Sequence, residues 1–171
     1  SHETDTQRIC ALADYVINAT LDETKKRITA TGTITYTNNS PHPLNYIWLQ
    51  LDQNIFKQDS VTNRTERTTT PIAPASDRLG MGTLRELQSY AETAHGFEIQ
   101  SVTDGGSRAI KYTINDTMMR VDLPTPLAPR QSTTLKLAWA FNIVDNNVFG
   151  GRSGYEHFRD SDTYTFFQAQ W

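Results

Sequence analysis

In the segment from Ile28 to Thr37, ITATGTITYT, apolar or small residues alternate with threonines at every second position. One side of the alternation carries Ile28, Ala30, Gly32, Ile34 and Tyr36, and the other carries Thr29, Thr31, Thr33, Thr35 and Thr37. Successive side chains of a pleated strand point to opposite faces, so the segment predicts a β-strand with one buried face and one face in water. Its regularity is explained by packing in a sheet and requires no catalytic role.

Other short runs of strand-forming residues are bounded by Gly, Pro, Asn or Asp, at 14–22, 44–56, 96–103, 109–115, 118–124 and 131–144. Residues 14–37 predict a hairpin across the polar turn DETKK. Both faces of the LNYIWLQL run are largely apolar, which predicts a central strand that buries Trp48. Gly105 and Gly106 predict a hairpin turn with positive φ.

Together these segments predict an all-β fold, a twisted antiparallel β-sandwich or saddle-like sheet. Residues 57–95 are rich in Thr, Ser, Pro and charge, and predict a long irregular surface loop with at most one short helix near 83–92. The length of 171 residues fits one domain, 1–171.

Composition excludes two classes of partner. The net charge is −3, the pI is about 5.8, and no Lys/Arg cluster is interleaved with aromatic residues, so nucleic acid is not an expected partner. No apolar run approaches the roughly 20 residues that span a bilayer, and the chain is expected to be soluble.

No residue pattern indicates catalysis or a metal site. Cys10 is best interpreted as a small buried side chain, and His2, His42, His95 and His157 are scattered. Glu156 and His157 are adjacent on a predicted strand and point to opposite faces, so they cannot chelate one ion. The GGRSG run at 150–154 predicts a flexible turn, and Asp160 with Asp162 predicts a solvated loop.

The last residues, TYTFFQAQW, end in an apolar run instead of the polar, mobile tail that is common at domain ends. We therefore expect the chain to be truncated before a further domain that packs against this one.

Both ends of the chain carry a family resemblance. The segments YVINATLDETKKRITATGTITYTNNSPHPLNYIWLQLDQNIF and GGRSGYEHFRDSDTYTFFQAQW resemble the amino-terminal domain of bacterial zinc aminopeptidases of the aminopeptidase N family. The resemblance implies a saddle-like β domain that caps a catalytic domain in which a His-Glu-x-x-His helix holds zinc. No cofactor is expected in these residues, zinc is expected in the absent catalytic domain, and the family favours an exported, periplasmic or cell-surface protein.

The resemblance also implies substrate-binding residues. In the family, the last strand of this domain ends in a Glu or Gln that helps to hold the free α-amino group of a peptide substrate, and Gln168 takes that place, with Gln170 on the same strand face. A Gln carbonyl oxygen can accept a hydrogen bond from an ammonium, but it is a weaker anchor than a carboxylate. The alternative role of Gln168 is an edge-strand amide that binds neighbouring backbone.

Two other functions stay open from the sequence. A stand-alone β-sandwich binding or adhesion module would use the 57–95 loop and the Thr-rich strand faces as its partner surface. A carbohydrate-binding sandwich would need a flat row of exposed aromatic side chains, whereas Trp48, Trp139 and Trp171 lie in strand patterns that predict burial.

Overall fold

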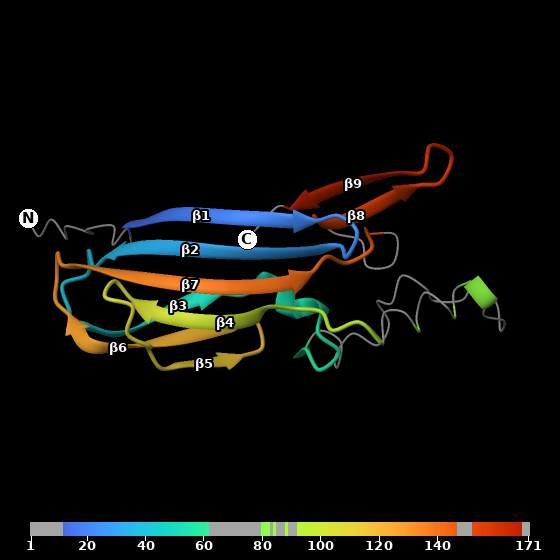
Figure 1. The fold of residues 1–171 in the computed structure, drawn as a ribbon. Helices are drawn as coiled ribbons and strands as arrows, with labels where there is room; N and C mark the ends of the chain where they lie inside the picture. Colours follow the sequence, from blue (N-terminus) through green and yellow to red (C-terminus); the bar gives the residue numbers. More distant parts are fainter. Residues whose placement is uncertain are drawn as a thin grey trace, which may run out of the picture.

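The computed structural model describes residues 12–61, 80–82, 84, 88, 92–146 and 152–168. It is all-β, as predicted (Figure 1). The elements are β1 (Leu12–Asp22), β2 (Arg27–Thr37), β3 (Leu44–Gln50), the 3-10 helix η1 (Asp52–Phe56), β4 (Glu98–Asp104), β5 (Tyr112–Asn115), β6 (Met118–Leu127), β7 (Ser132–Asn142), β8 (Ser153–Phe158) and β9 (Thr163–Gln168). No helix in the described ranges is long and apolar enough to span a membrane.

Three antiparallel sheets organise these strands. A four-stranded sheet has the order β1-β2-β7-β4, a three-stranded sheet has the order β3-β6-β5, and β8 and β9 form a separate ribbon. The first two sheets share one apolar core, to which the larger sheet contributes Leu135, Leu137 and Trp139 and the smaller one contributes Met119 and Val121. The two sheets therefore pack as a sandwich.

The hairpin predicted for residues 14–37 is confirmed by the pairing of β1 with β2. The alternation within β2 is confirmed as well, because Ala30, Gly32 and Ile34 are buried whereas Thr29 and Thr31 are exposed. The apolar face of β2 lies in the core between the sheets.

The prediction that residues 44–51 form a central strand is wrong. β3 lies at the edge of the smaller sheet, next to β6 alone, and Trp48 is 49% exposed. The buried residues Ile47 and Leu49 face the core, while the aromatic residues of the other face meet solvent. The guanidinium of Arg120 lies 4.3 Å from the centre of the Tyr46 ring, a cation-π contact that partly compensates this exposure.

The turn at Gly105 and Gly106 also differs from the prediction. The positive φ, 66°, belongs to Ser107, and neither glycine adopts one. Asp104 and Arg108 close the local turn through backbone hydrogen bonds, after which the chain crosses from β4 in the larger sheet to β5 in the smaller one. The predicted hairpin is confirmed over a short stretch, because Ala109 forms an antiparallel bridge with Thr103 and the Ile110 N–H donates to the Val102 carbonyl, but the pairing does not continue into β5.

Most of the predicted 57–95 loop lies outside the described residues. The described part contains no strand, and Leu84, Gln88 and Glu92 have helical backbone within the range predicted for a short helix. Beside this loop, the buried Asn54 side chain accepts a hydrogen bond from the backbone N–H of Phe97 and donates one to the Asp116 carbonyl. It thereby ties η1 to the beginning of β4 and to the β5–β6 turn.

Gly32 is required where β2 passes under Trp139. A Cβ atom at Gly32 would lie 2.9 Å from two atoms of the Trp139 ring, and that ring is only 2% exposed and cannot move aside. We expect Gly32→Ala to lower the free energy of unfolding by about 1–3 kcal/mol, measured by urea denaturation. Gly82→Ala is the control, because no atom lies within 4 Å of its added Cβ. An equal effect of the two substitutions would contradict the close approach.

Arg27 and Glu98 join the ends of β2 and β4 across β7 through two hydrogen bonds, of 2.9 and 2.6 Å. The hydrogen bond from Arg27 lowers the pKa of Glu98 below its usual range. The pKa of Glu98 is lower in the folded state than in the unfolded state. The pair therefore stabilises the fold at pH values above the ordinary glutamate pKa, and this stabilisation is lost as the pH falls through the folded-state pKa.

We therefore expect Glu98→Gln to reduce the loss of stability between about pH 7 and about pH 3, measured by urea denaturation at both values. Glu23→Gln, in the exposed β1–β2 turn, is the control. An unchanged acid sensitivity in Glu98→Gln would show that the pair does not contribute.

Candidate functional site

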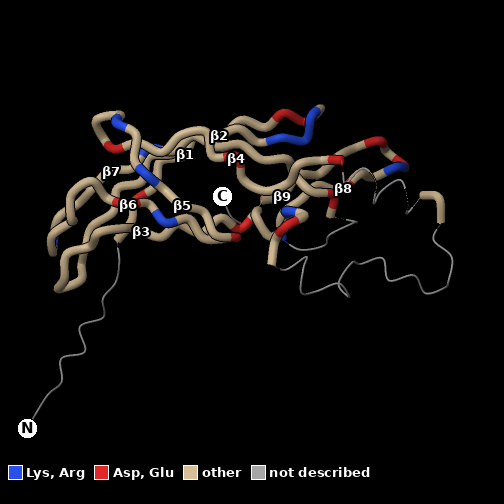
Figure 2. The backbone as a smooth tube through the Cα atoms, turned by 90° about the horizontal axis from the view of Figure 1, so that it is seen from below, with Lys and Arg blue, Asp and Glu red and all other residues tan. Residues whose placement is uncertain are grey.

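The predicted substrate residue Gln168 lies on the β8–β9 ribbon, which extends beyond the sandwich strands in both views (Figures 1 and 2). β8 and β9 pair in continuous antiparallel register from Ser153 with Gln168 to Phe158 with Thr163. The turn that joins them points away from the sandwich and includes Asp162, with a φ of 49°. The end of β9 that carries Gln168 is thus at the base of the ribbon.

Backbone contacts fix the base of the ribbon to the segment after β7. The N–H of Tyr155 donates to the carbonyl of Val144 at 2.9 Å, and Asp145 forms a parallel bridge with Tyr155. In addition, the side-chain amide of Asn146 donates a hydrogen bond to the Glu156 carboxylate at 2.7 Å. Gly154 permits this approach, because an added Cβ would lie 3.0 Å from the Val144 carbonyl oxygen. The ribbon therefore continues from the core strand β7 as an anchored unit.

An aromatic stripe covers one face of the ribbon. It is formed by cross-strand partners: Tyr155 lies opposite Phe166, and His157 lies opposite Tyr164. The rings of His157 and Tyr164 stack with centroids 4.4 Å apart, and Tyr155 is 6.1 Å from both Tyr164 and Phe166. Such contacts stabilise a two-stranded ribbon that would be marginal alone.

Lys26 connects this stripe to the β1–β2 hairpin. Its ammonium lies 4.1 Å from the Tyr164 ring centre and 5.2 Å from that of Tyr155. Burial, together with the nearby Asp145 carboxylate, raises the pKa of Tyr155 to about 12, so its hydroxyl stays protonated at neutral pH. The ribbon is therefore held at its base by backbone hydrogen bonds, and the Lys26 ammonium packs on its aromatic face.

Gln168 ends β9 on the face that carries the stripe, because it pairs with Ser153 in the same register as Phe166 with Tyr155. Its side chain is exposed. An amide at this position can accept a hydrogen bond from an ammonium and donate one to a carbonyl. Gln170, predicted on the same face, lies outside the described residues.

Among the other predicted candidates, the structure brings His157 and Asp162 together, with 2.9 Å between the ring Nε2 and the carboxylate Oδ1. Glu156 contacts Asn146 instead, so the prediction that Glu156 and His157 diverge is confirmed. His42 and His95 lie elsewhere in the described chain, and Cys10, His2 and Trp171 lie outside the described residues. The interpretation of 150–154 as a turn is wrong in its second half, because Ser153 and Gly154 begin β8.

Residues that the sequence reasoning missed are Lys26 and the aromatic stripe itself. The sequence signal for the stripe is that aromatic or imidazole rings stand two residues apart on both strands, at Tyr155 and His157 and at Tyr164 and Phe166. No sequence signal connects Lys26 to the stripe, because Lys26 is too distant in the chain. In the described ranges, no group of three or more His, Cys, Asp or Glu side chains could hold a metal ion, so these residues do not fit a zinc site.

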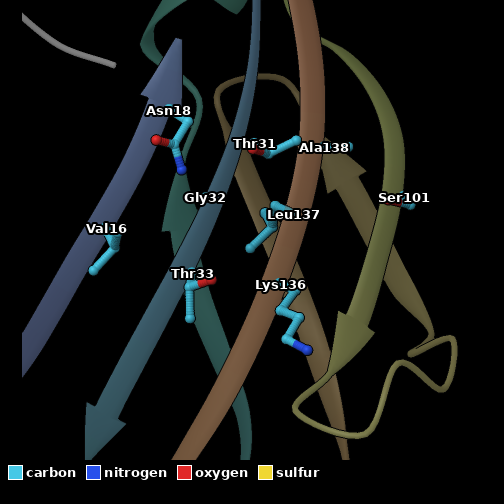
Figure 3. Close-up of a pocket in the computed structure, with 9 residues that line it drawn as sticks. All are labelled: Val16, Asn18, Thr31, Gly32, Thr33, Ser101, Lys136, Leu137 and Ala138. Atoms are coloured by element: carbon cyan, nitrogen blue, oxygen red, sulfur yellow. The ribbon is translucent and has the colours of Figure 1, made fainter.

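A hollow of about 250 Å³ lies on the outer face of the larger sheet (Figure 3). Its lining includes Thr31, Thr33, Ser101 and Lys136, part of the Thr-rich surface predicted for a binding module. The Lys136 ammonium donates to the Gly105 carbonyl at 3.0 Å, so the charged side chain among the described lining residues is already bound. The hollow does not gather groups that would select a ligand.

Comparison with known proteins yields fold neighbours alone. No family model and no curated protein sequence matches the chain. A two-domain M1 zinc metallopeptidase mutant bound to L-arginine is similar over 77% of this chain and 21% of its own, with a TM-score of 0.44 and 16% identity. The M1 zinc metallopeptidase from Deinococcus radiodurans gives a TM-score of 0.41 and 17% identity over 77% of this chain and 20% of its own.

A mutant of the Deinococcus radiodurans protein covers 84% of this chain and 24% of its own, with a TM-score of 0.43 and 16% identity. The chain thus spans about a fifth to a quarter of the length of these solved chains. At these values the likeness is one of strand arrangement, and it says nothing about activity.

The Lys26 contact generates a test of how the ribbon is held. A partly exposed cation-π contact contributes about 0.5–1 kcal/mol, so Lys26→Met should raise hydrogen exchange of the β8 and β9 amides about two- to five-fold. Lys25→Met is the matched control, because Lys25 pairs with Asp22 in the same turn and its side chain is 75% exposed. Unchanged exchange in Lys26→Met would show that the backbone contacts alone hold the ribbon.

Proposed function

We propose that this chain is the non-catalytic amino-terminal domain of a zinc-dependent, aminopeptidase-like metallopeptidase. In that role it caps the active site and contributes to recognition of the amino terminus of a peptide substrate. Its partners are the catalytic domain of its own full-length chain and the peptide, and the parent protein is exported to the periplasm or cell surface.

The observation that carries the proposal is the position of Gln168. Its exposed amide ends β9 on the face of the aromatic stripe, at the base of a ribbon fixed to the sandwich. A residue that recognises a substrate group must be both accessible and held in place, and Gln168 meets both requirements. The family resemblance of the two sequence ends assigns the same residue to the substrate amine.

The proposal assigns zinc and every catalytic residue to the part of the parent protein outside these 171 residues. The described residues hold no metal-ligand cluster, and no step of peptide hydrolysis is attributed to them. The contribution of Gln168 is a hydrogen bond from the substrate ammonium to its carbonyl oxygen, which positions the amino terminus.

We expect Gln168→Ala in the full-length, zinc-loaded gene product to lower kcat/KM about 10- to 100-fold, because a hydrogen bond to a charged group contributes about 1.5–3 kcal/mol. The measurement is hydrolysis of aminoacyl-anilides, with the same anilides blocked at the amine for comparison. Gln168→Glu should raise kcat/KM for the free amines, since a carboxylate pairs with ammonium more strongly.

Gln100→Ala, an exposed position on β4, is the matched control and should leave the rate unchanged. The 171-residue chain alone should be inactive. An equal loss on free and blocked substrates would refute the amine-binding role, and a native gene that stops just after Trp171 would refute the whole proposal.

A second candidate function, a stand-alone binding or adhesion module, is favoured by one observation. Tyr46 and Trp48 are 41% and 49% exposed on the outer face of the smaller sheet, in an edge-to-face pair with centroids 6.0 Å apart. Exposed aromatic residues beside an arginine are common in protein-binding surfaces. Their ring planes differ by 78°, which does not form the flat platform of a carbohydrate site.

A further inference from the structure

The outer edge of β1 is open to pairing with a further strand. β1 is the terminal strand of the four-stranded sheet, and within the described ranges no strand pairs with its other side (Figure 1). All eleven of its residues pair with β2 in one register, with no shift. The edge is therefore long and continuous, and its backbone groups can pair with another strand.

The other edges of the two sheets carry features that oppose such pairing. The pairing of β4 with β7 shifts register between Ile99 and Ser101, and the pairing of β3 with β6 shifts between Leu44 and Tyr46. β5 has four residues. β1 contains no Lys, Arg or Pro and no bulge, the usual features that protect a natural edge strand.

β1 also leaves apolar surface exposed on the face that continues the core. Tyr15 lies opposite the buried Ile34 and Ile17 opposite the buried Gly32, so both side chains are on the inner face of the sheet. They are nevertheless 48% and 38% exposed, and Leu21, on the same face, is 39% exposed. The three-stranded sheet does not extend far enough to cover them, which leaves an apolar overhang.

We propose that β1 pairs with β1 of a second copy of this chain, antiparallel and centred on Ile17, to form a closed two-fold dimer. This inference does not depend on the proposed function. On the inner face the register opposes small and large side chains: Ala13 meets Leu21, Tyr15 meets Ala19, and Ile17 meets its own copy. The inner-face sequence is thus complementary to itself when reversed, as an isologous contact requires.

Charge is compatible with the same register. The two acidic residues of the strand, Asp14 and Asp22, fall opposite Thr20 and Leu12, so no carboxylate faces another. Among the described strands of the two sandwich sheets, β1 is the one long edge without a bulge, and each copy uses it, so the assembly closes at two chains and joins the two four-stranded sheets into one.

The first test is sedimentation velocity of the 171-residue chain over a range of concentrations. A single-strand interface is smaller than the roughly 1,200 Å² of standard complexes, so the expected dissociation constant is on the order of 10 µM. Ile17→Lys places two ammonium groups together at the symmetry axis and should weaken dimerisation at least about ten-fold. Thr113→Lys, an exposed strand residue of β5 with the same charge change, should not alter it.

The second test replaces Cys10, the one cysteine, with serine and introduces a new cysteine on β1. Ile17→Cys should form an intermolecular disulfide under mild oxidation, because opposed residues of antiparallel strands lie within disulfide range. Thr20→Cys should not, since its copy would be about 20 Å away in this register. A chain that stays monomeric to about 500 µM, equal cross-linking at both positions, or growth beyond two chains would overturn the proposal.

Discussion

Burial of the inner face of β7 is the interaction on which the rest of the structure depends. β7 pairs with β2 on one side and β4 on the other, and Leu135, Leu137, Trp139 and Phe141 are each at most 3% exposed. These side chains fix the larger sheet against the smaller one through close packing. The chain then leaves β7 through Val144, whose carbonyl accepts the hydrogen bond that anchors the ribbon. The position of Gln168 is therefore set by the core, through the base of β8.

Two buried amide side chains, Asn38 and Asn54, hold turns of the scaffold. Asn38 donates to the carbonyls of His42 and Leu127, and Asn54 bonds backbone groups of two distant segments. Both are fully buried, and both satisfy the backbone where it turns, which is the usual role of a buried amide. These two amides therefore belong to the scaffold, whereas Gln168 is an exposed amide at the end of β9.

Local periodicity was enough to predict the strands and the burial of β2, because side-chain direction in a strand follows sequence parity. It could not predict the place of β3 in its sheet. An apolar outer face does not determine the position of a strand in its sheet, and the contact of Arg120 with the Tyr46 ring, on that face, joins residues that are distant in the sequence. The φ at Ser107 was missed because a turn with two glycines does not itself determine which residue adopts the left-handed conformation. Gln168 was predicted through the family resemblance, whereas its alignment with the aromatic stripe depends on the register of β8 and β9.

The β1–β2 hairpin connects the two surfaces from which binding is inferred. Its turn carries Lys26, which covers the aromatic stripe, and its outer strand carries the unprotected edge. Lys26 adopts a φ of 51°, uncommon for a residue with a long side chain. That conformation is sustained because the turn is closed by Asp22 on one side and its cation packs on the ribbon on the other. A contact that shifts β1 would therefore act on the same turn whose Lys26 side chain packs on the ribbon.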